Sequence, residues 1–279
     1  MPALTFSKWS SGGNTTIFLH DCDAPPEWQA AYARAVLSPH VLGAEQAGAV
    51  SLSRRSLRMA GGEFCVNASR AFGALLALAP RCRDSAFEAE ICVSGWEGPV
   101  RLTVRGSEPR WQVAARLLLP PVTRPEAVAG VPSGARLVRL PGISHLLLPL
   151  PDGASLPPDL AESAREALGR AGLLDEAAAG AIWWRPVGPG FAMTPVVHVR
   201  DARTLVAESA CGSGALALAL QLADRSGLCE CDLTQPSGSR LRVRVGEPGA
   251  DGSVEARIDG PVTLLARGRV WLEAADGKD

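Results

Sequence analysis

The sequence predicts an α+β protein made of two homologous domains that face each other. Its 279 residues suffice for two domains of ordinary size, and its 47% of hydrophobic residues can fill two cores. One order of elements, strand, turn, strand, helix and hairpin, occurs twice, about half a chain apart. A repeat that occurs only twice argues against a solenoid, which needs three or more short units. We place the two domains at residues 1–130 and 131–279.

Each half opens with two strands separated by a turn that contains glycine. The alternation of apolar and polar residues around glycine is typical of paired strands. The expected strands span Leu4–Phe6 and Ser11–Phe18 in the first half, and Leu137–Leu140 and Ile143–Leu147 in the second.

Each half continues with a helix and a hairpin. Ala71–Leu78 and Ala215–Leu222 are rich in Ala and Leu, which predicts helices buried on most sides. The segments after them alternate in polarity around Gly and Pro, which is typical of hairpins. The hairpin strands are Phe87–Val93 with Val100–Arg105, and Leu228–Leu233 with Leu241–Val245.

Two further segments complete the prediction. Leu156–Gly172 has apolar residues at a spacing of three to four, which predicts an amphipathic surface helix. Arg257–Glu273 predicts two short strands around Gly260-Pro261 and Gly268, followed by a frayed polar tail.

The charge and hydropathy patterns exclude several functional classes. Lys plus Arg number 28 and Asp plus Glu number 29, so the net charge of -1 gives no field that would gather nucleic acid or anionic lipid. The apolar runs are shorter than the roughly 20 residues that span a bilayer. The N-terminus has no basic and apolar signal pattern, so we expect a cytoplasmic protein.

Seven cysteines at irregular spacing predict free thiols instead of a disulfide framework. Cys229 and Cys231 are interpreted as part of a strand, because the four histidines offer no second ligand pair at zinc-site spacing. Cys22, Cys82 and Cys92 are interpreted as packing residues. We expect no metal.

Cys65 and Cys211 are different, because each directly precedes one of the two repeated helices. Backbone N–H groups and the dipole at a helix N-terminus stabilise a thiolate, which lowers its pKa. A twofold relation between the halves would bring both thiols to one cleft from opposite sides. Inverting an amino acid at Cα needs a base on one face and an acid on the other, and two thiols meet that need. The helix N-termini could stabilise the negative charge that develops on the substrate carboxylate.

These motifs resemble those of the diaminopimelate epimerase family. Glu63–Arg70 is similar to the motif of the first catalytic cysteine, and Ala210–Ala215 to that of the second. The resemblance extends to Gly13-Asn14, Gly142–His145 and Gln235–Gly238, and so covers nearly the whole chain in order. It implies two pseudo-symmetric domains, each a sheet wrapped around a central helix. It also implies catalysis without pyridoxal phosphate or any other cofactor.

The resemblance also implies roles for single residues. Cys65 and Cys211 would be the acid and base, Asn14 and Asn67 would contact the substrate, and main-chain amides would hold its α-carboxylate. Those amides belong to Val66, Ala68, Gly212, Ser213 and Gly214.

Three more residues near these motifs have open roles. Glu208 is a candidate for binding the substrate ammonium, the alternative being a charge that interacts with the helix dipole. His145 is a candidate substrate contact, the alternative being a buried histidine behind the site. Arg70 could pair with a carboxylate in the cleft or form a salt bridge elsewhere.

Departures from the family pattern bear on the substrate. The family has Gly on both sides of the asparagine after the first cysteine, where this sequence has Val66 and Ala68. It also has a Glu-Arg pair ahead of the second cysteine, where Ala202 and Arg203 stand here, so the acid for a distal ammonium is missing. Diaminopimelate is therefore disfavoured.

Two variant signatures resemble the histidine racemase branch of the family. They are Met193-Thr194-Pro195 and Glu208–Gly214. This branch supplies D-histidine for opine metallophores of the staphylopine type. We therefore predict a cofactor-independent histidine racemase whose partner is a small amino acid.

Several alternatives stay open from the sequence alone. The chain could racemise another amino acid, diaminopimelate included. It could catalyse a different proton shift, as the phenazine-biosynthesis isomerases do, or bind a carboxylate without chemistry. The oligomeric state, homodimer included, is also open.

Overall fold

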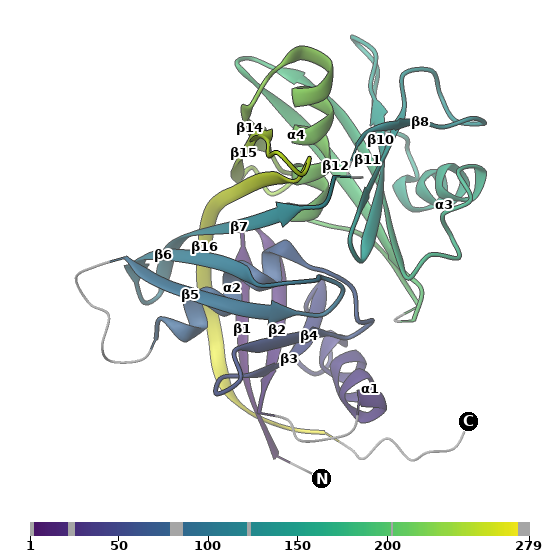
Figure 1. Ribbon diagram of the computed structural model, residues 1–279. Helices are drawn as coiled ribbons and strands as arrows, with labels where there is room; N and C mark the ends of the chain where they lie inside the picture. Colours follow the sequence, from purple (N-terminus) through teal and green to yellow (C-terminus); the bar gives the residue numbers. More distant parts are fainter. Residues whose placement is uncertain (1–2, 22–25, 79–85, 122–123, 202, 273–279) are drawn as a thin grey trace.

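The computed structural model describes residues 3–21, 26–78, 86–121, 124–201 and 203–272. The described strands form one mixed sheet, accompanied by four helices (Figure 1). The helices are α1 (Pro26–Leu37), α2 (Val66–Leu76), α3 (Leu160–Arg170) and α4 (Gly212–Ser226). The strands of the first half are β1 (Ala3–Ser11), β2 (Asn14–His20), β3 (Gln46–Ser51), β4 (Ser56–Met59), β5 (Phe87–Val93), β6 (Val100–Ser107) and β7 (Arg110–Leu119). The other strands are β8 (Glu126–Ala127), β9 (Arg136–Leu140), β10 (Ile143–Pro149), β11 (Ala178–Val187), β12 (Gly190–Val199), β13 (Thr204–Ala207), β14 (Glu230–Thr234), β15 (Arg240–Pro248) and β16 (Val254–Trp271).

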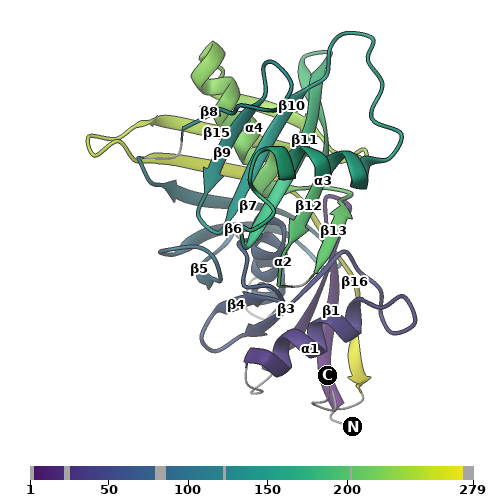
Figure 2. The same ribbon diagram turned by 90° about the vertical axis from the view of Figure 1, so that its right-hand side faces the viewer.

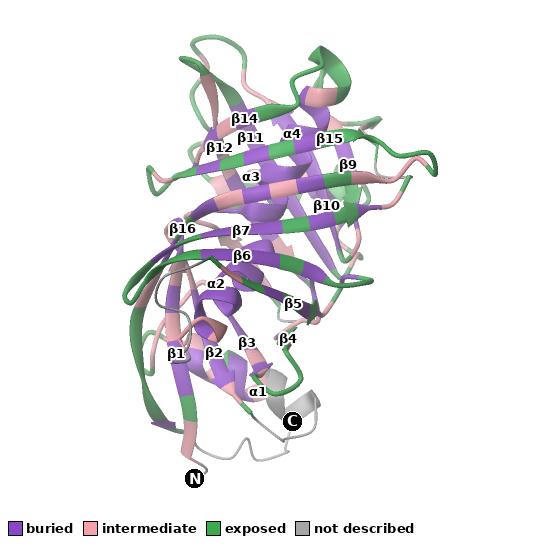
Figure 3. Cartoon of the chain, turned by 60° about the vertical axis from the view of Figure 1, so that its left-hand side comes forward, coloured by how far each residue is buried: buried purple, intermediate pink, exposed green. Residues whose placement is uncertain are grey.

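The first half is a closed ring of strands around α2. Strands β1 to β7 pair in chain order, and β16 pairs with both β7 and β1 to close the ring. Helix α2 packs against β1, β2, β5, β6, β7 and β16. All its residues from Val66 to Leu75 are buried, as the colouring in Figure 3 shows. This is the environment that the Ala/Leu-rich sequence predicts.

In the second half, strands also pack around a central helix, α4, but the path of described strands ends at β8 and does not close into a ring. The sheet continues from β16 through β15, β14, β12, β11, β10 and β9 to β8. Helix α4 packs against β9, β10, β14, β15 and β16, and Gly212–Leu222 is buried. The helix ends at Gly227, whose φ of 68° is the left-handed conformation that favours glycine after a helix.

Helix α3 covers the outer face of the second half (Figure 2). Because strand residues point alternately to the two faces, the run Leu146–Leu148 serves two cores. Leu147 lies in the core that contains α4, whereas Leu146 and Leu148 lie in the core under α3. The predicted surface helix is confirmed, but it begins at Leu160 because Asp159 caps it through a hydrogen bond from the Glu162 amide.

The last strand corrects the prediction of two short strands in Arg257–Glu273. A single strand, β16, runs over Val254–Trp271, and Glu273 lies outside the described residues. Gly260 does not form a turn, because β16 continues through it. A Cβ at this position would lie 2.6 Å from Cδ2 of Leu241 and 2.8 Å from Nη2 of Arg70. The glycine therefore serves close packing within a continuous strand.

Strand β16 connects the two halves. Its first part pairs with β15, and its last part, residues 262–271, pairs with β1. The division into residues 1–130 and 131–279 stays a prediction, and the pairings cross it here and at β8, which pairs with β9.

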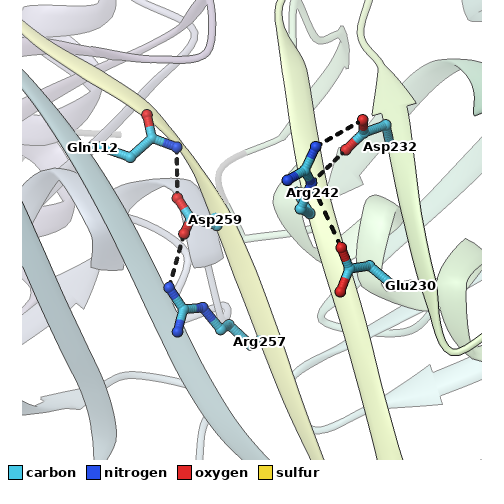
Figure 4. A network of polar contacts seen from close by, with 6 residues as sticks. All are labelled: Gln112, Glu230, Asp232, Arg242, Arg257 and Asp259. Atoms are coloured by element: carbon cyan, nitrogen blue, oxygen red, sulfur yellow. Dashed lines mark hydrogen bonds and ion pairs between the residues drawn. The ribbon is translucent and has the colours of Figure 1, made fainter.

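A polar network crosses the outer surface at this junction (Figure 4). Gln112 on β7 donates to the Asp259 carboxylate at 2.6 Å, and Arg257 donates to the same carboxylate at 3.0 Å. On the neighbouring strands, Arg242 pairs with Asp232 at 2.8 Å and with Glu230 at 3.8 Å. Exposed pairs of this kind contribute about 0–1 kcal/mol each, so the network adds little stability.

The two predicted hairpins and the opening strands of each half are confirmed. The interpretation of Cys92 as a packing residue is wrong, because it faces solvent beside the exposed Glu88 and Glu90 of β5. Cys22 and Cys82 lie outside the described residues.

Helix α1 was not predicted, although Pro26 at its first position is a start signal. None of the helices in the described part of the chain combines the length and apolar character that crossing a membrane requires.

Candidate active site

Cys65 and Cys211 cap the two central helices in the same way. Cys65 has φ −131° and ψ 108°, and Cys211 has φ −132° and ψ 109°. Each sulfur accepts a hydrogen bond from the third helical amide, Ala68 N at 3.3 Å and Gly214 N at 3.4 Å. The two cysteines therefore occupy equivalent places in the two halves.

The two helix N-termini meet directly. A Cβ on Gly212 would lie 2.8 Å from Cβ of Val66 and 2.9 Å from Oδ1 of Asn67. The side-chain amide of Asn67 donates to the carbonyl oxygen of Ala210 at 2.9 Å. The absence of a side chain on Gly212 is thus what lets α4 approach α2 so closely.

Both cysteines line one cavity between the halves. Its carboxylates are Glu45 and Glu63 from the first half and Glu208 from the second, and its described lining contains no Lys, Arg or His. It measures about 50 Å³, far below the roughly 300–1,000 Å³ of typical small-molecule sites. An amino acid can therefore enter only if the walls move apart.

A chain of amides supports Cys65. Its thiol donates to Oε1 of Gln46 at 3.2 Å. Nε2 of Gln46 in turn donates to Oδ1 of Asn14 at 2.5 Å and to the hydroxyl of Thr16 at 2.8 Å. Asn14 also donates to Glu45 at 2.9 Å. Asn14 is buried and is not among the cavity-lining residues, so in this structure it orients Gln46 and Glu45.

Cys211 has a different support. Its sulfur lies 3.6 Å from the hydroxyl of Ser213, which is 2.9 Å from Nε2 of His145. Its main-chain amide donates to Oε1 of Gln235 at 2.9 Å. Gln235, from the motif Gln235–Gly238, thus fixes the entry into α4.

His145 lies behind the cavity and not in its wall. The side chain is 0% exposed, and burial lowers its pKa to about 3, so the imidazole is neutral. Among the described residues its Nδ1 has no hydrogen-bond partner. A Cβ on Gly180 would lie 2.4 Å from that atom, so Gly180 makes the space for the ring. His145 can reach the cavity only through Ser213.

The structure reverses the expected direction of the cysteine pKa shifts. Burial raises the pKa of Cys65 to about 12, and the charge of Glu208 adds to this. Burial and the charge of Glu208 also raise the pKa of Cys211 well above its ordinary value. The helix amides oppose these effects but do not outweigh them. Both thiols are protonated at neutral pH in the unliganded chain.

The carboxylates are also perturbed. Burial raises the pKa of Glu208 to about 8 and also raises the pKa of Glu63. A cationic ligand would favour the ionised forms of these groups, because it restores the favourable interactions that burial removes.

The predicted carboxylate-binding amides divide into two sets. Those of Ala68 and Gly214 are bonded to the cysteine sulfurs. The first two amides of a helix have no partner within it, which leaves those of Val66, Asn67, Gly212 and Ser213 as the available donors. All four of these residues line the cavity.

Sequence analysis missed Glu45, Gln46 and Glu63 as cavity residues. Glu45-Gln46 is a polar pair at the start of the apolar strand β3, and this break in polarity was the available signal. Ala202 and Arg203 stand where the family has a Glu-Arg pair ahead of the second cysteine. Arg203 is exposed, and Ala202 lies outside the described residues. No cluster of three or more potential metal ligands occurs among the residues that the structure describes.

Comparison with known proteins defines the family. A family model described as "Histidine racemase CntK N-terminal domain" matches residues 3–271. The chain belongs to this histidine racemase family. Two histidine racemases from strains of Fusobacterium nucleatum subsp. nucleatum are 26% and 27% identical to it, over 96% of this chain and 97% of each relative. The chain is therefore an isomerase, as the two cysteine motifs predicted.

Solved structures support the same grouping at the level of fold. A phenazine biosynthesis protein of the PhzF family from Bacillus anthracis has a TM-score of 0.71 at 12% identity, covering 98% of this chain and 100% of that one. A hydroxyproline epimerase from Agrobacterium vitis has a TM-score of 0.67 at 13% identity, covering 99% of this chain and 93% of that one. Members of the histidine racemase family thus share a fold with proteins of several activities.

Proposed function

We propose that this enzyme racemises histidine without a cofactor, and that Cys65 and Cys211 act as acid and base on opposite sides of Cα. The observation that carries the proposal is that two cysteines in the same helix-capping conformation line one cavity from opposite halves. Inversion at Cα requires proton removal on one face and proton delivery on the other. A single base would return the proton to the face that it came from.

The helix N-termini would hold the substrate carboxylate. The amides of Val66 and Asn67 on α2, and of Gly212 and Ser213 on α4, are donors fixed before the reaction. As the Cα proton leaves, negative charge moves onto the carboxylate oxygens, and such preorganised donors stabilise it. This accounts for the close contact between the two helices at Gly212.

One turnover consists of a short series of proton transfers. One thiol first loses its proton, and Glu208 can accept it when a bound cationic substrate has favoured the ionised carboxylate. That thiolate takes the Cα proton and becomes a thiol. The opposite thiol gives its proton to the other face and becomes the thiolate. The two groups have then exchanged roles, ready for the reverse direction.

Cavity charge supports histidine as the substrate. The lining has Glu45, Glu63 and Glu208 and, in its described part, no basic side chain, which favours an ammonium together with an imidazole that can carry a second positive charge. The second carboxylate of diaminopimelate would be repelled by the same glutamates. The two curated relatives are named histidine racemases, which supports the same choice.

Two finer proposals accompany this function. We infer that the halves are pseudo-symmetric domains, each a sheet wrapped around its central helix, which the matching caps of α2 and α4 support. We also propose that the product D-histidine is used for an opine metallophore, which rests on the resemblance of Met193-Thr194-Pro195 to that branch of the family.

Chiral chromatography of the purified protein with L-histidine, under reducing conditions and without pyridoxal phosphate, tests the proposal. We expect D-histidine to form. Cys65→Ser and Cys211→Ser should each lower turnover by about 100- to 10,000-fold, the usual contribution of one acid–base group. Cys92→Ser is the matched control, because Cys92 is exposed and is not among the cavity-lining residues.

The outcomes separate substrate from mechanism. Turnover of a different amino acid, lost in both cysteine variants, would keep the mechanism and discard histidine. Full turnover in either cysteine variant would contradict the acid–base assignment. Binding of L-histidine without turnover would favour a carboxylate-binding protein.

A further inference from the structure

Arg70 is a buried cation that the proposed mechanism does not use. It lies in the second turn of α2, and its side chain is 0% exposed. Nε donates to the carbonyl oxygen of Val113 at 3.1 Å, and Nη2 to that of Pro261 at 3.0 Å. Nη1 donates to Oδ1 of Asn67 at 3.3 Å. All three acceptors are neutral.

A buried guanidinium normally has a carboxylate partner, because desolvation of an unpaired charge is costly. No salt bridge to Arg70 occurs among the described residues. Asp259 is near enough to favour the charged form, but its carboxylate is bonded to Gln112 and Arg257 (Figure 4). Burial lowers the pKa of Arg70 only to about 10, so the side chain is charged at neutral pH.

The position of Arg70 relates this charge to the site. It is five residues after Cys65 on the same helix, and it holds the amide of Asn67, which reaches across to Ala210 beside Cys211. The equivalent residue five positions after Cys211 is Leu216, which is apolar and buried. The two helix N-termini therefore match in backbone, but at this position only α2 carries a buried charge.

We propose that Arg70 is a positioning residue whose buried charge makes the α2 end of the cavity the anion-stabilising end, so that Cys65 loses its proton before Cys211 does. The inference rests on the proposed function only in treating the two thiols as the acid–base pair. Arg70 would act through space on the Cys65 thiolate and through Asn67 on the junction between the helices.

The groups that face the two thiols support this order. Cys65 is near Glu63, Glu208 and the neutral amide of Gln46, with Arg70 behind it. Cys211 is near Glu208 and the hydroxyl of Ser213, with the neutral His145 behind. Both thiols thus feel Glu208, and Cys65 feels Glu63 as well, but only the Cys65 helix carries a buried cation, because Arg225 of α4 is exposed in the last turn.

Alkylation by iodoacetamide tests the order of ionisation without any turnover. In Cys211→Ser the rate at Cys65 is followed against pH by peptide mass spectrometry, and in Cys65→Ser the rate at Cys211 is followed in the same way. We expect the midpoint for Cys65 to be lower by about one pH unit or more, the scale on which a nearby charge acts. An equal or lower midpoint for Cys211 overturns the proposal.

Substitution of Arg70 then tests the cause. In the Cys211→Ser background, Arg70→Gln should raise the Cys65 midpoint by about one unit, whereas Arg70→Lys, which keeps the charge, should leave it nearly unchanged. Arg116→Gln removes an exposed arginine of β7 and is the matched control. A Cys65 midpoint unmoved by folded Arg70→Gln would assign Arg70 a packing role only.

Failure of the two proposals can be told apart. If Arg70→Gln does not fold, the comparison of the two single-thiol proteins with Arg70 intact still decides the order. If Cys65 ionises first but no amino acid is racemised, the inference about Arg70 stands and the proposed function falls.

Discussion

The N-termini of α2 and α4 are alike in backbone but differ in the side chains that support each sulfur. The caps agree within one degree in φ and ψ, and both sulfurs accept from the third helical amide. Glu208 acts on both thiols, but Cys65 is supported by an amide chain and a buried arginine, whereas Cys211 is supported by a serine and a neutral histidine.

The comparison shows that the positions of the two sulfurs and the order in which the thiols ionise depend on different parts of the structure. The backbone repeat places two equivalent sulfurs at one cavity, which is what a reversible inversion requires. The side chains around each sulfur then decide which of the two ionises first. A racemase needs both properties, since the two thiols must be similar in position but must differ in protonation at any moment.

Among the changes that keep both thiols, Gly212→Ala gives the largest expected effect, because it breaks the contact that brings the two caps together. The new Cβ would lie 2.8 Å from Cβ of Val66, so α4 must move away from α2. A displacement of about 1 Å costs about 100-fold in rate, and we expect turnover of histidine to fall by about that factor.

A compensating change makes this prediction specific. Val66→Gly removes the opposing side chain, so the double variant should recover part of the lost turnover. Gly169→Ala near the end of α3 is the control and should leave turnover unchanged, since its new Cβ meets nothing closer than 3.4 Å. Unaltered turnover in Gly212→Ala would contradict the proposed role of the close contact.

Glu208→Gln should change how stability depends on pH. Burial raises the pKa of Glu208 from 4.5 to about 8 in the folded chain. The protonated form is therefore favoured by folding, and its stabilising contribution is lost as pH rises from about 4.5 through about 8. Glutamine does not titrate, so its advantage over glutamate should grow over this range.

Thermal unfolding at about pH 5 and about pH 9 measures this advantage. We expect Tm of Glu208→Gln to exceed that of the parent by several degrees at the higher pH and to match it closely at the lower pH. Glu88→Gln changes an exposed glutamate of β5 and should shift Tm at neither pH. The same small shift at both pH values would mean that Glu208 is not held in its neutral form.

Gly180→Ala should act on the Cys211 side alone. The new Cβ would lie 2.4 Å from Nδ1 of His145, which forces the ring away from Ser213. Overpacking of this kind costs about 1–3 kcal/mol in unfolding free energy, measured by urea denaturation. The alkylation midpoint of Cys211 should move while that of Cys65 does not, and a shift at Cys65 alone would contradict the separation of the two supports.

The sequence was informative wherever the signal was local. The helices that follow Cys65 and Cys211, the two hairpins and the opening strands all depend on periodicity and turn residues within about twenty positions. The pairing of the two cysteine motifs also predicted the family and the isomerase activity, which the family match bears out.

What the sequence did not predict depends on contacts between distant segments. Arg70 is held by Pro261, 191 positions away, and Asn67 by Ala210, 143 positions away. The continuity of β16 depends on Gly260 packing against Arg70 and Leu241, which no local pattern encodes. The direction of the cysteine pKa shifts was wrong for the same reason, because burial is a property of the assembled fold.

Deuterium incorporation from solvent during the first few per cent of turnover tests the central claim most directly. With L-histidine in deuterated water, a two-thiol mechanism delivers solvent deuterium only to the opposite face. We therefore expect α-deuterium in the D-histidine formed and none in the L-histidine that remains. Deuterium at equal levels in both isomers would show a single base serving both faces and would contradict the account.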